Sequence, residues 1–138
     1  MDQKLFNRLQ ILVNKTYYTS KRYKVPSTFA YLYHADPLTV EDLGKFVRIS
    51  DHFIKMDENH YFINFAYTEQ DDAFKASQNL LLYLDKHFNN STSCIALDTF
   101  NTSNSAKIVF NRLERILAET KKDPYSRIED ENILDGFI

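Results

Sequence analysis

Hydrophobic side chains recur along this sequence with two different periods, one typical of helices and one typical of strands. Where they return every third or fourth position, they share one face of an α-helix. Leu5, Leu9 and Val13 have this spacing near the amino end. The same period predicts four helices, over residues 3–24, 40–49, 69–88 and 106–122.

The boundaries of these helices carry familiar start and stop signals. Pro26 ends the first helix, because the residue before a proline disfavours helical geometry. Thr39 with Asp42, and Thr68 with Asp71, resemble capping boxes that open the second and third helices. Other candidate caps are Asp2 for the first helix and Ser103 or Ser105 for the fourth.

Four further segments are rich in β-branched and aromatic residues, which predicts strands. In YFINFAY, Tyr61, Ile63 and Phe65 alternate with Phe62, Asn64 and Ala66. The polar stretch DENH before it predicts the tip of a hairpin. The predicted strands cover residues 28–34, 52–56, 61–67 and 92–100.

The order of these elements predicts the fold class. A βαββαβ core preceded by one extra helix is the ferredoxin-like plan, an α+β fold arranged as an α/β sandwich. We expect one domain over residues 1–138, whose acidic end, IEDENILD, adds one short strand and then frays as a solvated tail over about the last ten residues. This plan hosts many functions, so it does not decide the function.

Composition narrows the class of protein. Hydrophobic residues make up 43% of the chain, which is typical of a globular protein and not of a disordered one. The net charge of −2 gives no general reason to expect nucleic acid or a membrane surface as a partner. No apolar stretch approaches the roughly 20 residues of a membrane span. We therefore expect no nucleic-acid and no membrane partner.

The cysteine count and the amino end bear on location. Cys94 is the single cysteine, so no internal disulfide can form, and this fits a reducing cytoplasm. The start, MDQKLFNRL, has neither the apolar core nor the cleavage site of a signal peptide. We therefore expect a cytoplasmic protein.

Several short motifs, taken in order, resemble the GGDEF domain, the diguanylate cyclase module of bacterial signalling. The resemblance runs nearly end to end and depends on the order and spacing of the motifs, since none is specific alone. The matching stretches are Leu5-x-Asn7-Arg8 in the first helix, Pro26 followed by FAYLYHAD, Ser50-Asp51, the acidic helix start TEQDDA, Thr92 to Ala96, Lys121, and Arg127-Ile128.

The signature that names the family falls on DENHY. Asp57 and Glu58 stand where the family has two glycines, which let the backbone approach the guanine nucleotide because no Cβ blocks it. Their carboxylates would also repel a triphosphate. Asn59 and His60 replace the two acids, and neither offers the anionic oxygen that a hard cation prefers. Tyr61 completes this altered signature.

The first strand departs from the family as well. The metal-binding aspartate would fall at Tyr33 or His34, and Asp36 is the acidic residue nearby. The following segment, which contacts the nucleotide in the family, has no counterpart. The resemblance with these departures implies a degenerate GGDEF domain that is not an enzyme, with no catalytic residue, metal or cofactor.

A second motif of the family is retained. Arg48 and Asp51 form Arg-x-x-Asp five residues before the signature, the register of the inhibitory site that binds cyclic di-GMP in many diguanylate cyclases. A guanidinium can fork onto phosphate or guanine, and a carboxylate can accept from guanine N–H groups. The alternative is a surface ion pair. Asn79 stands where a further arginine normally completes the ligand site.

Two histidines raise the question of a metal. His34 and His60 lie at the ends of neighbouring predicted strands and can approach each other to hold an ion. Ordinary polar histidines are the simpler interpretation, because no zinc-type spacing is present.

Two functions remain. The first is a regulatory, non-catalytic signalling domain that senses cyclic di-GMP through Arg48 and Asp51. The alternative is a protein-interaction or scaffold module that binds no nucleotide. In both cases we expect another signalling protein as the partner. An enzyme with residual nucleotide chemistry is the least favoured function.

Overall fold

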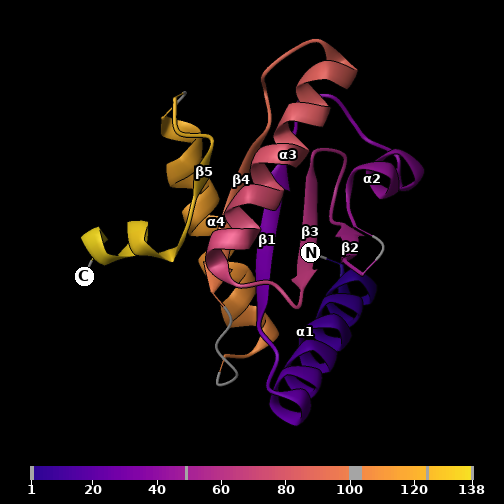
Figure 1. Ribbon diagram of the computed structural model, residues 1–138, viewed down its shortest axis with the longest axis vertical. Helices are drawn as coiled ribbons and strands as arrows, with labels where there is room; N and C mark the ends of the chain where they lie inside the picture. Colours follow the sequence, from indigo (N-terminus) through magenta and orange to yellow (C-terminus); the bar gives the residue numbers. More distant parts are fainter. Residues whose placement is uncertain (1, 49, 100–103, 124, 138) are drawn as a thin grey trace.

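The computed structural model describes residues 2–48, 50–99, 104–123 and 125–137. The helices and strands follow the predicted order (Figure 1). They are α1 (Gln3–Tyr23), β1 (Ser27–Tyr33), α2 (Val40–Phe46), β2 (His52–Lys55), β3 (His60–Ala66), α3 (Gln70–Phe88), β4 (Cys94–Thr99), α4 (Ala106–Lys122), β5 (Ile128–Glu129) and the 3-10 helix η1 (Glu131–Phe137).

The five strands form one sheet in the order β2-β3-β1-β4-β5. The four core strands are antiparallel to their neighbours, with β1 between β3 and β4, and β5 is added parallel to β4. Ala30 in the centre of β1 pairs with Ile63 on one side and Leu97 on the other. This strand order is the ferredoxin-like plan, so the predicted α+β fold class is confirmed.

Because successive side chains of a strand point to opposite faces, the sheet builds two separate cores. On one face Ile63 packs with Leu43 of α2 and Leu84 of α3. On the other face Phe62 packs with Val13 of α1 and Leu113 of α4. Figure 1 shows α3 in front of the sheet and α4 behind it, as a sandwich requires.

Most of the predicted caps form. The Asp2 carboxylate accepts hydrogen bonds from the backbone N–H groups of Lys4 and Leu5. Thr39 opens α2, and Ser105 opens α4; Ser103 lies outside the described residues. The predicted cap at Thr68 is wrong.

Thr68 bonds elsewhere. It is fully buried, and its hydroxyl donates to the carbonyl of Ala66 and accepts from Arg48. Helix α3 therefore starts after Glu69, with no side-chain cap. The long-range contact with Arg48 takes priority over the local one.

Two predicted boundaries and the predicted tail differ from the structure. Helix α2 ends at Phe46, because Val47 has extended geometry. Strand β4 begins at Cys94, two residues after its predicted start, and its predicted end, Phe100, lies outside the described residues. The acidic end is not a solvated tail, since Ile133 and Leu134 pack against the core on the α1–α4 side. Ile133 and Leu134 thus attach the 3-10 helix η1 to the core.

Candidate functional site

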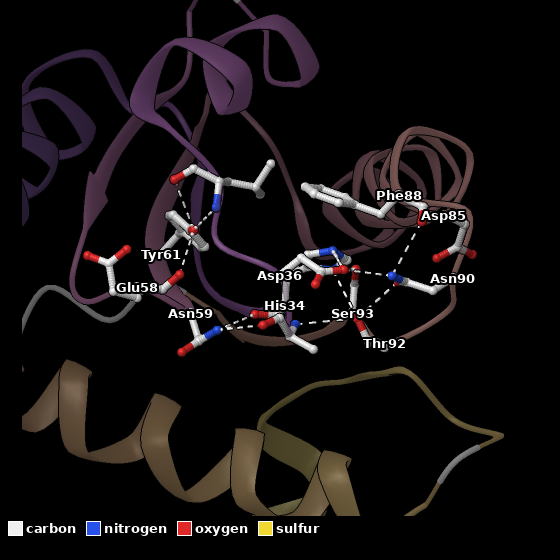
Figure 2. Close-up of polar contacts among 12 residues, drawn as sticks. His34, Asp36, Glu58, Asn59, Tyr61, Asp85, Phe88, Asn90, Thr92 and Ser93 are labelled. Carbon is white, nitrogen blue, oxygen red and sulfur yellow. Dashed lines mark hydrogen bonds and ion pairs between the residues drawn. The ribbon is translucent and has the colours of Figure 1, made fainter.

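The altered signature lies against the end of the first strand. Antiparallel pairing sets His60 of β3 opposite Tyr33 of β1. The backbone N–H of His34 then donates to the carbonyl of Asn59, at 3.0 Å. The hairpin tip and the end of β1 therefore form one site (Figure 2).

Asn59 joins the two segments through its side-chain amide. Its Nδ2 donates to the carbonyl oxygens of His34 and Ala35, at 3.0 and 2.8 Å. Figure 2 shows the amide aimed at the backbone that follows β1. The two carbonyl oxygens need a hydrogen-bond donor at this position, which the amide supplies. A carboxylate in place of the amide would be repelled by them unless a cation lay between the carboxylate and the carbonyls.

Tyr61 ties the hairpin to the loop that follows the strand. Its hydroxyl is buried, accepts from the N–H of Leu38 at 2.7 Å, and lies 3.1 Å from the carbonyls of Leu38 and Glu58. Burial raises the pKa of Tyr61, although the hydrogen bond with Leu38 opposes this. The phenol stays neutral and acts as a fixed connection.

His60 lies on the opposite side of the sheet from this contact. Its ring stacks on Tyr31, with 5.4 Å between centroids. Nδ1 lies 2.9 Å from the carboxylate of Asp57, and Nε2 lies 3.3 Å from the ammonium of Lys121. A neutral imidazole satisfies both contacts by donating to Asp57 and accepting from Lys121.

The charges at the tip are compensated within the chain. Burial raises the pKa of Asp57, but hydrogen bonds from the Asn59 backbone and from His60 outweigh it, and the net pKa is lowered. The Lys121 ammonium also lies 4.0 Å from the centroid of the Tyr33 ring. The side chains of Asp57, Glu58, Asn59 and His60 therefore all bond to neighbouring groups.

His34 does not meet His60, so a metal held between these two histidines is ruled out. His34 is fully buried on the α3 face, with its ring 4.4 Å from that of Phe88 and its Nδ1 2.5 Å from the hydroxyl of Ser93. Burial lowers the pKa of His34, and the carboxylate of Asp36, 4.0 Å away, opposes this. Because His60 pairs with Tyr33, its side chain lies on the same face as that of Tyr33, and the side chain of the next residue, His34, lies on the opposite face.

Within the described part of the chain, no group of three His, Cys, Asp or Glu side chains is arranged to hold a metal ion. In the same residues, no helix is both long enough and apolar enough to cross a membrane.

The Arg-x-x-Asp motif forms an internal clamp. Nε and Nη2 of Arg48 donate to the two carboxylate oxygens of Asp51, at 3.0 and 2.8 Å. Nη2 also donates to the carbonyl of Ala66 at 3.2 Å and to the hydroxyl of Thr68. The Asp51 side chain is 1% exposed and accepts from the N–H of Ala66 as well. The clamp fastens the start of β2 to the end of β3.

The third predicted ligand residue stays apart from this clamp. Asn79 is exposed on α3, and among the described residues no hydrogen bond joins it to Arg48 or Asp51. The hydrogen bond that Arg48 donates to Asp51 is the main cause that raises the pKa of Arg48, and the charge of Asp72 raises it further. An anionic ligand would meet that second carboxylate.

Sequence reasoning missed one feature, a groove of about 480 Å³ between α1 and β2. The signal that could have found it is Asn64, a polar residue at a strand position whose neighbours on the same face are apolar.

A ferredoxin-like sheet between two helical layers, with a hairpin tip against the end of the first strand, is the fold of GGDEF domains. The GGDEF domain of DgcB from Caulobacter crescentus, in complex with c-di-GMP, superposes with a TM-score of 0.69 at 8% identity, over 88% of this chain and 85% of that one. The active GGEEF domain of a diguanylate cyclase from Vibrio cholerae gives 0.71 at 13% identity, over 91% and 95%.

A third similar structure contains a protein partner. The diguanylate cyclase SiaD from Pseudomonas aeruginosa, in complex with its activator SiaC, gives a TM-score of 0.70 at 11% identity, over 90% of this chain and 57% of that one. No family model and no curated protein matches the chain by sequence. The similarity is therefore one of fold, and the chain has the GGDEF-domain fold.

Proposed function

We propose that this protein is a non-catalytic signalling domain of the GGDEF type, which acts by binding another signalling protein. The observation that carries the proposal is the amide of Asn59, which donates to the carbonyls of His34 and Ala35 where the family has an acid. An amide nitrogen in this place closes the strand end and offers no ligand to a cation.

The remaining signature positions support the same conclusion. Enzymatic phosphoryl transfer depends on metal ions that bridge the phosphates and neutralise the developing charge. Here His60 is held between Asp57 and Lys121, and the side chain of Glu58 is 75% exposed. The site thus combines a missing metal ligand with carboxylates that repel a triphosphate.

The first test is a direct assay for synthesis of cyclic di-GMP. We expect purified protein to form none from GTP with Mg²⁺ or Mn²⁺, under conditions in which an active GGDEF domain turns over. Turnover that His60→Ala abolishes would overturn the proposal. The Lys107→Ala variant is the control for preparation effects, because Lys107 is exposed in the first turn of α4, at the opposite end of the helix from Lys121.

A second candidate is a receptor for cyclic di-GMP. It is favoured by one observation: the Arg48 side chain is 48% exposed, and its Nη1 makes no hydrogen bond among the described residues. The ligand found with the similar DgcB domain makes this candidate worth testing. It is disfavoured because Arg48 already bonds to Asp51, Ala66 and Thr68, which a ligand would have to displace.

Calorimetric titration with cyclic di-GMP separates the two candidates. The protein-binding function predicts no heat in the wild type or in Asn79→Arg. The receptor function predicts binding that Asn79→Arg tightens and Arg48→Ala removes, because a bidentate charged contact is worth about 2–4 kcal/mol. Gln78→Arg adds the same charge at the neighbouring exposed position and is the matched control.

A further inference from the structure

The groove between α1 and β2 lies at the edge of the sheet, away from the hairpin tip. Leu9 and Val13 of α1 pack into the core, so the adjacent flank of this helix lies beside β2, the strand at one edge of the sheet. Figure 1 shows α1 running beside this edge of the sheet. The groove has a volume of about 480 Å³, within the range of sites for small molecules.

The floor of the groove contains a buried polar group with an unused acceptor. Asn64 is 3% exposed, and its Nδ2 donates to the hydroxyl of Thr16 at 3.1 Å. That hydroxyl donates its own proton to the carbonyl of Leu12 at 2.8 Å, so it must accept from Asn64. The orientation of the amide is thereby set, and Oδ1 is left without a partner among the described residues.

An unused buried acceptor is costly. Leaving such a group unsatisfied typically costs about 1–3 kcal/mol, and buried polar groups in native proteins are nearly always paired. Asn64 sits opposite His52 in the β2–β3 register, and both line the groove. A ligand with an N–H or O–H donor, or an ordered water, would satisfy Oδ1.

The charges that line the groove are all of one sign. Arg8 and Lys15 stand two turns apart on the same flank of α1. Within the described part of the chain, neither Arg8 nor Lys15 makes an ion pair or a hydrogen bond. No aspartate or glutamate among the described residues lines the groove. The chain as a whole carries a net charge of −2. A local positive surface on an acidic protein favours an anionic ligand.

The walls are apolar and accessible. Ile11 on α1 is 55% exposed, and Tyr67 at the opposite rim is 61% exposed. Tyr67 has a φ of 55°, a left-handed geometry that is unfavourable for a residue with a side chain. Ile54 contributes apolar surface from β2. Such walls fit a flat or compact organic body.

We propose that the groove between α1 and β2 binds a small organic anion with an apolar body and a hydrogen-bond donor. The donor bonds to Oδ1 of Asn64, the anionic group lies between Arg8 and Lys15, and the body packs on Ile11 and Ile54. This inference is independent of the proposed function, because it uses neither the hairpin tip nor Arg48.

Two commercial probes test each part of the proposal. The first is 8-anilinonaphthalene-1-sulfonate, an aromatic anion with an N–H group, and the second is N-phenyl-1-naphthylamine, which has the same body and N–H but no sulfonate. We expect the sulfonate to bind at one site per chain, at least about tenfold more tightly than the neutral probe.

Charge variants on one helix test the anion contact. Arg8→Gln with Lys15→Gln should raise the dissociation constant of the sulfonate about tenfold and leave that of the neutral probe unchanged. Lys4→Gln with Lys21→Gln removes the same charge from the same helix outside the groove and should change neither constant. Equal binding of the two probes, or equal effects of the two double variants, would overturn the proposal.

Asn64→Leu tests the buried acceptor. Removing an unsatisfied polar group should raise the melting temperature, while the loss of Oδ1 should weaken both probes severalfold. An asparagine with a merely structural role predicts the reverse, a lower melting temperature with unchanged binding by the folded protein. That result would contradict the assigned ligand contact. Near-UV circular dichroism confirms that the probes report on the native state.

Discussion

Arg48 shows how a residue of a ligand-binding motif can serve the fold. Its guanidinium bonds to Asp51, Ala66 and Thr68, and thereby fastens two strands and the start of a helix. The exposed part of the pair contributes little, since surface ion pairs are worth about 0–1 kcal/mol. The contact stabilises the fold mainly through Asp51, because this buried carboxylate would otherwise be removed from water without a compensating charge.

His34 gives a prediction about pH. Burial lowers its pKa from the ordinary value of 6.5, so below this pH the unfolded chain binds a proton that the folded chain does not. Its contribution to the unfolding free energy is complete above pH 6.5 and is lost as the pH falls toward the lowered pKa. We expect a loss of up to about 1.4 kcal/mol per pH unit in this window.

Urea denaturation at pH 7.5 and pH 5.5 measures this effect. His34→Gln should remove most of the slope, and His52→Gln, which replaces an exposed histidine, should keep it. A wild-type slope that survives in His34→Gln would show that other groups cause the pH dependence.

The β2–β3 hairpin is held in place by contacts of its own side chains. Its tip is joined to the strand end by the amide of Asn59 and to the following loop by the hydroxyl of Tyr61. The N–H of Leu38 and the carbonyls of His34 and Ala35 thereby gain partners within the protein. The side chains of Asn59 and Tyr61 therefore stabilise the hairpin.

Asn59→Asp tests this interpretation. A carboxylate would face the carbonyls of His34 and Ala35 in place of a donor, so the unfolding free energy should fall by about 2–4 kcal/mol. Asn59→Ala loses the same hydrogen bonds without the repulsion, and should cost only about 1–2 kcal/mol. Chemical denaturation at pH 7 measures both, and an aspartate variant as stable as the wild type would contradict the assigned role of the amide.

In the whole molecule, the hairpin tip and the groove between α1 and β2 lie in different places. The sheet divides the helices into a layer of α2 and α3 and a layer of α1 and α4, each with its own core. The hairpin tip is contacted by the end of α4 through Lys121, whereas the groove lies under α1 at the β2 edge. None of the tip residues 57–61 lines the groove.

The repeating pattern of apolar positions was enough to predict the order of helices and strands. Helical and strand periods are local properties, and the βαββαβ order leaves few ways to bury both faces of a sheet. The presence of Asn59 and His60 at the predicted hairpin tip was equally visible, because it needs only the identity of the residues.

The partners of the polar side chains depended on the tertiary structure. Arg48 meets Ala66 and Thr68 only because β2 and β3 pair in one register, and Asn64 meets Thr16 from a helix 48 positions away in the sequence. The β1–β3 register sets His60 opposite Tyr33, so His34 and His60 lie on opposite faces. Local patterns carry no information about such contacts, since a shift of one residue in strand pairing would exchange every side chain between the two faces.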